Sequence, residues 1–296
     1  MYLSRSFFSI LFAANLLTGC GNDEPLIEER YEAPDALFSK LETNVLGSNS
    51  LEKIVAIDHS RLGKKSGSEM PPARVLIFSN PRLEAELMKE NSLVGIDLPL
   101  RALAYESVPD GNSKVIYNSF EFIKSRYGLS TTIELESAYK ASMSEAIQGI
   151  GPEQMAFFTQ DSMDPDGITT IDSPYDFSTT IEKVMAGINS QDDTVSFGSV
   201  DFQKRSEAVG ITIKPATLIL FGGPAPGAKA MKKAPSLGLD AFCQKFLVWQ
   251  DENNKVHLSF NDLLDIAERQ DVGKSIALRV INYRLNKVFS EVLIEK

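Results

Sequence analysis

The sequence predicts an α+β protein in which two tandem copies of one small sheet-and-helix sandwich domain pack on each other as a pseudo-dimer. The first observation is an internal repeat: a shift of 143 positions aligns residues 72–97 of the 296-residue chain with residues 215–240, giving nine identities in 26 positions without a gap. This period exceeds the roughly 20–50 residues of solenoid repeats, so the repeated unit is a whole domain. The second observation is the order of patterns, with helices between the early strands of each copy and neighbouring strands near its end. Either a strand edge or a helix face is compatible with the contact between the copies.

The elements of the two copies are predicted in the same order. A helix with apolar residues at helical spacing comes first, followed by a short strand, a short polar helix and a continuous apolar strand that we expect to be buried on both faces. A helix, a strand, its hairpin partner and a closing helix complete each copy. The predicted long helices are 34–46 and 176–188, the first strands 54–57 and 194–197, the central strands 74–78 and 217–221, the third strands 100–105 and 245–249, and the closing helices 133–147 and 276–293.

The domain boundaries follow from these elements. The first repeat domain is predicted over residues 35–150 and the second over 175–296. Residues 151–174 form the linker, because 160–174 is rich in Asp, Gly, Ser and Pro.

The composition excludes several classes of protein. With 43% hydrophobic and 24% charged residues, the chain is globular rather than disordered or multiply membrane-spanning. Its 40 Asp and Glu residues outnumber 30 Lys and Arg residues, for a formal net charge of -10. Because no basic stripe is present to neutralise phosphates, we expect no nucleic-acid partner.

The first 19 residues are predicted to be an export signal. Arg5 precedes an apolar stretch, 7–17, that is too short to span a bilayer. The stretch ends in Leu17-Thr18-Gly19-Cys20, which resembles the lipobox of bacterial lipoproteins. The resemblance implies that Cys20 carries lipid and begins the mature chain; the alternative is an ordinary secretory signal with an incidental cysteine. We therefore expect a lipid-anchored protein of the bacterial cell envelope that faces the periplasm, with the outer membrane favoured because Gly21, not an aspartate, follows Cys20.

Residues 20–34 are predicted to be an acidic tether. This segment contains five acidic side chains against the single Arg30 and has few large apolar groups. As a flexible coil it would hold the first domain about 20 Å from the bilayer. Its charge would be repelled by anionic lipid, so we expect the lipid on Cys20 to be the only membrane contact.

Several motifs of the first copy together resemble one family. They are Phe78-Ser79-Asn80-Pro81, Met88, the run 95–101, Tyr105-Glu106 and Asp58-His59-Ser60. This set is similar to the bacterial domain of unknown function 302 family, over residues 37–120 and more faintly over 177–260. The resemblance implies a fold and the location of a pocket, but no activity. The second copy departs from the pattern, with Gly223 in place of Asn and Phe202 in place of His, so the resemblance implies that the first copy retains the site.

Four polar residues of the first copy form the candidate site. We expect His59, Asn80, Asp97 and Arg101 to converge beside the helix that begins after Asn80. Such a site would bind a small anion on backbone N–H groups and Arg101, with His59 as a donor or base. The alternative is that Asn80 caps the helix, Asp97 orders a turn and His59 satisfies a backbone carbonyl.

The remaining reactive side chains give no further site. His257 lies in an alternating pattern and is predicted to be a solvated strand residue, and Cys243 is predicted to be a buried, inert thiol. No Cys and His pair has the spacing of metal ligands, so no metal is expected. The glycine-rich run 222–229 lacks the final Gly-Lys-Ser/Thr of a phosphate loop, and no cofactor is expected.

The leading functional hypothesis is a lipid-anchored envelope protein that binds a small anionic ligand or a protein partner, without catalysis, through the first repeat. One alternative is an envelope enzyme, a hydrolase or isomerase that acts on a small anion with His59 as acid or base and Asp97 beside it. The other is a purely structural protein that docks an envelope partner.

Overall fold

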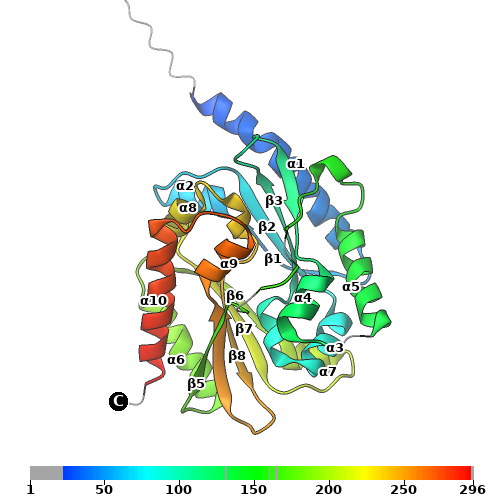
Figure 1. Cartoon of the computed structure of the whole chain (residues 1–296), viewed down its shortest axis with the longest axis vertical. Helices are drawn as coiled ribbons and strands as arrows, with labels where there is room; N and C mark the ends of the chain where they lie inside the picture. The colour runs from blue at the N-terminus through cyan, green and yellow to red at the C-terminus, as the bar shows by residue number, and fades with distance from the viewer. Residues whose placement is uncertain (1–22, 131, 160, 164–165, 295–296) are drawn as a thin grey trace, which may run out of the picture.

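The computed structural model describes residues 23–130, 132–159, 161–163 and 166–294. The expected export signal and Cys20 lie outside the described residues. Within them the chain forms two antiparallel sheets flanked by helices (Figure 1), which confirms the α+β prediction.

The first repeat builds a four-stranded sheet in the order β1-β2-β3-β4. Its elements are α1 (Asp23–Gly47), β1 (Glu52–Asp58), α2 (His59–Lys65), β2 (Ala73–Ser79), α3 (Pro81–Glu90), the 3-10 helix η1 (Ser92–Ile96), β3 (Leu100–Glu106), β4 (Ser113–Ile116), α4 (Phe120–Tyr127), α5 (Ile133–Ala146) and η2 (Pro152–Gln154).

The second repeat builds a five-stranded sheet in the order β5-β9-β8-β7-β6. Its elements are β5 (Ile168–Ser173), α6 (Phe177–Asn189), β6 (Val195–Asp201), α7 (Phe202–Ala208), β7 (Ala216–Gly222), α8 (Pro224–Met231), η3 (Pro235–Gly238), β8 (Gln244–Gln250), β9 (Val256–Asn261), α9 (Leu263–Arg269) and α10 (Ile276–Val292).

The central strands are buried because their apolar runs are covered on both faces. In the first repeat α1 packs on β2 and β3, while η3 of the second repeat contacts the same two strands. In the second repeat α6 packs on β8, and η1 of the first repeat contacts β7, β8 and β9. Each sheet is therefore completed by a short helix from the other repeat, and the core is continuous across the two repeats.

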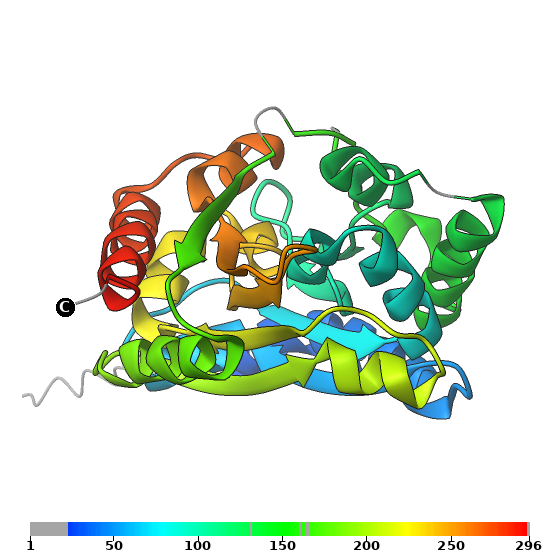
Figure 2. The same cartoon turned by 90° about the horizontal axis from the view of Figure 1, so that it is seen from below.

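Two helix pairs add to the contact between the repeats. Helix α2 of the first repeat packs against α8 of the second, and α7 of the second repeat packs against α3 of the first. Since α7 is the equivalent of α2 and α8 that of α3, the two contacts are equivalent to each other. The two pairs lie on opposite sides of the molecule, and the closing helices α5 and α10 lie at its two ends (Figures 1 and 2). The repeats thus pack about a pseudo-twofold axis through helix faces and 3-10 helices, not through a strand edge.

The segment expected to be a flexible tether is helical from Asp23 onward, as the first part of α1. Its glutamates favour helix formation. The helix is also held in place: Arg30 Nε donates to Glu106 Oε2 at 2.6 Å, and the Arg61 guanidinium lies 4.3 Å from the centre of the Tyr31 ring. The prediction of a coil over 23–34 was therefore wrong.

The expected linker also contains structure. Residues Ile168–Ser173 form β5, which pairs along β9 from Ile168 opposite Asn261 to Ser173 opposite Val256. Its β-branched Ile and Thr residues favour a strand, whereas the turn-forming residues are concentrated before it.

The described residues contain no helix long and apolar enough to cross a membrane.

Candidate functional site

Polar side chains from both repeats meet in the interior between them. In the first repeat Asp97 follows η1, Asn118 follows β4 and Arg126 lies on α4. Their equivalents 143 positions later are Asp240, Asn261 and Arg269, which occupy the corresponding places after η3, at the end of β9 and at the end of α9. All six are buried, with at most 7% of the residue surface exposed.

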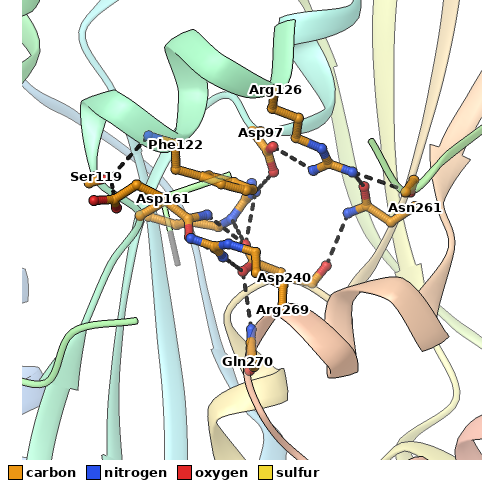
Figure 3. Close-up of polar contacts among 12 residues, drawn as sticks. Asp97, Ser119, Phe122, Arg126, Asp161, Asp240, Asn261, Arg269 and Gln270 are labelled. Carbon is orange, nitrogen blue, oxygen red and sulfur yellow. Dashed lines mark hydrogen bonds and ion pairs between the residues drawn. The ribbon is translucent and has the colours of Figure 1, made fainter. Parts of the chain in front are cut away.

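The two arginines bind across the pseudo-twofold axis. Arg126 donates from Nη1 to Asp97 Oδ2 at 2.7 Å and from Nη2 to Asn261 Oδ1 at 2.8 Å. Figure 3 shows its guanidinium between these two side chains. Arg269 Nη1 donates to Asn118 Oδ1 at 2.9 Å and lies 3.4 Å from Asp240 Oδ2. Each arginine therefore holds the aspartate of its own repeat and the asparagine of the other.

A second pair of basic residues completes the cluster. Arg101 on β3 binds Asp97 through Nη2, and the same nitrogen lies 3.3 Å from Asp240 Oδ1. Lys245 is the second residue of β8, as Arg101 is of β3, and its Nζ donates to the backbone oxygen of Asp240 at 2.7 Å. Eight residues, four from each repeat, thus form one cluster, which we call the dyad cluster: Asp97, Arg101, Asn118, Arg126, Asp240, Lys245, Asn261 and Arg269.

The dyad cluster contains four cationic side chains and two carboxylates. Although burial opposes its ionisation, the guanidinium groups of Arg126 and Arg101 lower the pKa of Asp97 below its ordinary value. Burial and the nearby Arg101 charge lower the pKa of Lys245 to about 8. Since removing charge from water is costly unless it is balanced, the formal excess of positive charge favours binding of an anion.

Arg269 keeps hydrogen-bond donors unused. Its Nε and Nη2 have no hydrogen-bond partner among the described residues. Its guanidinium carbon lies 3.4 Å from the ring centre of Phe122 and 4.3 Å from that of Phe158, so the cation is held between two aromatic faces.

A small cavity adjoins the dyad cluster. Its volume is about 10 Å³, and Asp240, Lys245 and Asn261 are among the residues that line it. This is close to the space that a single water molecule requires. The cavity therefore suits a water or a monatomic ion, not a larger organic molecule.

Of the four residues expected to converge, the structure brings Asp97 and Arg101 together. His59 is buried at the interface, where its Nε2 lies 3.1 Å from the backbone oxygen of Gly238, and burial lowers its pKa to about 4. Asn80 accepts from the Leu83 N–H at 3.2 Å as the cap of α3 and donates to Ser142 Oγ at 2.9 Å. None of the hydrogen bonds among the described residues joins His59 or Asn80 to the other two.

Two further expectations concern His257 and Cys243. His257 is not solvated: it is 9% exposed, its Nδ1 lies 2.9 Å from Asp172 Oδ1, and its ring lies 4.6 Å from that of Trp249. The prediction was wrong because β5, which pairs with β9 and places Asp172 opposite His257, was taken as linker. Cys243 is buried as a free thiol, and burial raises its pKa. No group of three or more potential metal-binding side chains occurs within the described part of the chain.

The comparison with known families matches both repeats. A family model described as "Domain of unknown function DUF302" covers residues 33–150 and 169–292. The chain belongs to the DUF302 family. Each DUF302 region supplies one aspartate, one asparagine and two basic side chains to the dyad cluster, so the cluster is a joint product of the two domains.

Curated relatives resemble only part of the chain. The proteins named fluoride-specific ion channel FluC 1 of Brucella suis biovar 1 and of Brucella abortus biovar 1 are each 34% identical over 109 residues, which is 37% of this chain and 42% and 40% of the relatives. The chain thus spans less than half the length of these curated relatives. A crystal structure of an uncharacterized conserved DUF302 protein from Bacillus stearothermophilus is 16% identical, with a TM-score of 0.36, and covers 43% of this chain and 95% of that protein.

Sequence reasoning missed most of the dyad cluster, although a signal was present. Asn118 and Asn261 are identical at the same 143-residue shift, as are Arg126 and Arg269. They lie beyond the gap-free block that ends at Asp97. Extending the self-alignment past that block would have selected them.

Proposed function

We propose that the chain is a non-enzymatic binding protein for a small anion, which it holds in the dyad cluster between the repeats. The observation that carries this proposal is the formal charge of the cluster, in which the four cationic side chains of Arg101, Arg126, Lys245 and Arg269 share the two carboxylates of Asp97 and Asp240. A bound monovalent anion would reduce this formal excess of two positive charges by one. In this proposal both repeats contribute to the site, not the first alone.

The size of the cavity supports a monatomic anion. A space of about 10 Å³ beside Lys245 accommodates an ion similar in size to water. The relatives from Brucella are named as fluoride-specific channels, and fluoride is such an ion. Fluoride is therefore the first anion to test.

The test compares melting temperatures in sodium fluoride and in sodium gluconate at equal ionic strength. We expect fluoride to stabilise the parent by about 2.7 kcal/mol at a hundredfold excess over Kd. In gluconate, Lys245→Met should melt at or above the parent temperature, because it removes an unbalanced buried charge. Fluoride should not stabilise this variant, and in the parent its effect should weaken as pH rises above about 8, where Lys245 loses its proton.

The matched control is Lys255→Met, which removes an exposed lysine from the turn before β9 and should retain the full fluoride effect. Equal stabilisation of Lys245→Met and the parent, or no effect of any halide on the parent, would leave the dyad cluster as a purely structural link between the repeats.

We also propose that lipid on Cys20 anchors the chain to the bacterial cell envelope, facing the periplasm. The support is the lipobox-like run at the end of the apolar stretch. Cys20→Ala should move the protein from the membrane fraction to the soluble fraction, while Cys243→Ala, at the buried thiol, should not. A membrane fraction unchanged by Cys20→Ala would refute the anchor.

A further inference from the structure

Basic residues gather where α2 of the first repeat crosses α8 of the second. The segments 59–65 and 224–233 contain six lysines and arginines and no acidic residue, in a chain whose net charge is -10. The crossing is close, because a Cβ atom added to Gly63 would lie 2.5 Å from the Ala228 Cβ. The basic residues of this α2–α8 corner are Arg61, Lys64, Lys65, Lys229, Lys232 and Lys233.

The equivalent corner on the other side of the molecule has no such charge. There α7 and α3 cross, and their segments 202–208 and 81–90 contain four basic and four acidic residues. Since the two corners share one backbone arrangement, the fold itself does not require the concentration of lysines. The charge is a feature of the α2–α8 corner alone.

The lysines of this corner are available to a partner. Arg61 is occupied by Asp35 and Asp58, each at 2.7 Å. The five lysines are exposed, and the ion pairs among the described residues include none of them. In an acidic molecule this leaves one surface complementary to an anionic partner.

A cavity opens at the same corner. It has a volume of about 240 Å³ and is bordered by Lys64 and Lys232, one from each repeat. Tyr31 and residues 70–72 (Met, Pro, Pro) supply apolar walls, and Glu69 is the acidic residue of the lining whose charge the two lysines outweigh. Arg30 also borders the cavity but is paired with Glu106.

We propose that the α2–α8 corner binds the phosphate of an anionic phospholipid headgroup, so that the chain rests on the membrane surface through this corner. Lysine is a compact point charge that suits phosphate. The apolar walls beside Lys64 and Lys232 fit the part of the lipid next to the phosphate. The basic corner is a second membrane contact, and so replaces the expectation that lipid on Cys20 is the only one.

The position of the amino-terminal helix selects the membrane as the source of the phosphate. Arg30 and Tyr31 of α1 border the cavity, and α1 extends back from them to Asp23 over about 10 Å of helix. Cys20 precedes Asp23 by three residues. This choice of partner rests on the proposed lipid anchor at Cys20, which would keep the corner close to the bilayer.

The test uses the full chain with Cys20→Ala, which cannot be acylated at this position, and measures its affinity for neutral detergent micelles doped with phosphatidylglycerol or with phosphatidylcholine. We expect binding only to phosphatidylglycerol, weakened at high salt. Each lysine should contribute about fivefold, so the double variant Lys64→Gln/Lys232→Gln should bind about 25-fold more weakly. The matched control is Lys89→Gln/Lys204→Gln at the opposite corner, which should bind like the parent. All the altered lysines are exposed, and melting temperatures check that the variants fold.

Equal losses in the two double variants, or no preference for phosphatidylglycerol, would overturn the proposal. Glycerol 1-phosphate in solution is the third arm: binding as tight as that of phosphatidylglycerol would overturn the membrane assignment and indicate a soluble phosphate ester. The micelle measurement does not depend on acylation, so a failed anchor at Cys20 and a failed headgroup site give separate results.

Discussion

At the scale of single residues, His59 shows how burial turns an expected functional group into a determinant of stability. Its ring is buried against Gly238, where an added Cβ atom would lie 2.9 Å from the His59 Cδ2. Burial lowers the pKa of His59 to about 4, well below the value of about 6.5 in an unfolded chain. The folded state therefore favours the neutral imidazole.

This shift predicts a pH-dependent loss of stability. The contribution of His59 is fully present above pH of about 6.5 and is lost as pH falls toward 4, by about 3 kcal/mol in total. Denaturation in urea at several pH values should show this loss in the parent but not in His59→Gln. Glu84 has the opposite pH dependence: burial raises its pKa to about 8, so its contribution to stability falls as pH rises. Because Glu84 is present in both proteins, the difference between the two profiles reports His59 alone. A parallel pair of profiles would contradict the assignment.

Neighbouring residues were easier to predict than distant ones. Asp97 and Arg101 are four positions apart, and the family resemblance already placed them together. The partners of Asp97 on α4, by contrast, depend on how a later helix returns to the sheet, which no local pattern encodes. Asn118 and Arg126 have no unusual local sequence, and only the internal repeat distinguishes them.

At the scale of elements, the crossing of α2 and α8 depends on the small size of Gly63. A Cβ atom at this position would lie 2.5 Å from the Ala228 Cβ and 2.8 Å from the Ser68 backbone oxygen. Gly63→Ala should therefore force the two helices apart and destabilise the protein by about 1–3 kcal/mol. The midpoint of urea denaturation measures this effect.

Gly47→Ala is the matched control for this crossing. Gly47 is the last residue of α1, and an added Cβ atom there would have no heavy atom within 4 Å. Its midpoint should stay near that of the parent. Similar midpoints for the two variants would mean that the crossing can relax without loss.

Long apolar patterns predicted elements well, and short or exposed ones did not. The central strands β2 and β7 were expected from continuous apolar runs, and both are almost wholly buried. Helices α4 and α9 have only eight and seven residues, too few for a clear helical period. Strand β5 was hidden by the composition of the residues before it, and it is stabilised by pairing with β9, which lies far along the chain.

At the scale of the whole molecule, the repeat of 143 residues predicted two domains but not their contact. The contact is reciprocal: η1 covers the second sheet and η3 covers the first. Such an exchange of short helices leaves no periodic signal, because it depends on three-dimensional packing between segments about 140 residues apart. The same packing brings buried polar residues of both repeats close together (Figure 3).

The crossed hydrogen bonds of Arg126 and Arg269 also bear on how the two copies can change over time. After a duplication, one copy is ordinarily free to accumulate substitutions while the other keeps its role. Here each arginine relies on an asparagine of the other copy, so a loss on one side leaves a buried charge without its partner on the other. Substitutions at these arginines and asparagines are therefore constrained in both copies together, whereas the charges of the α2–α8 and α3–α7 corners can diverge.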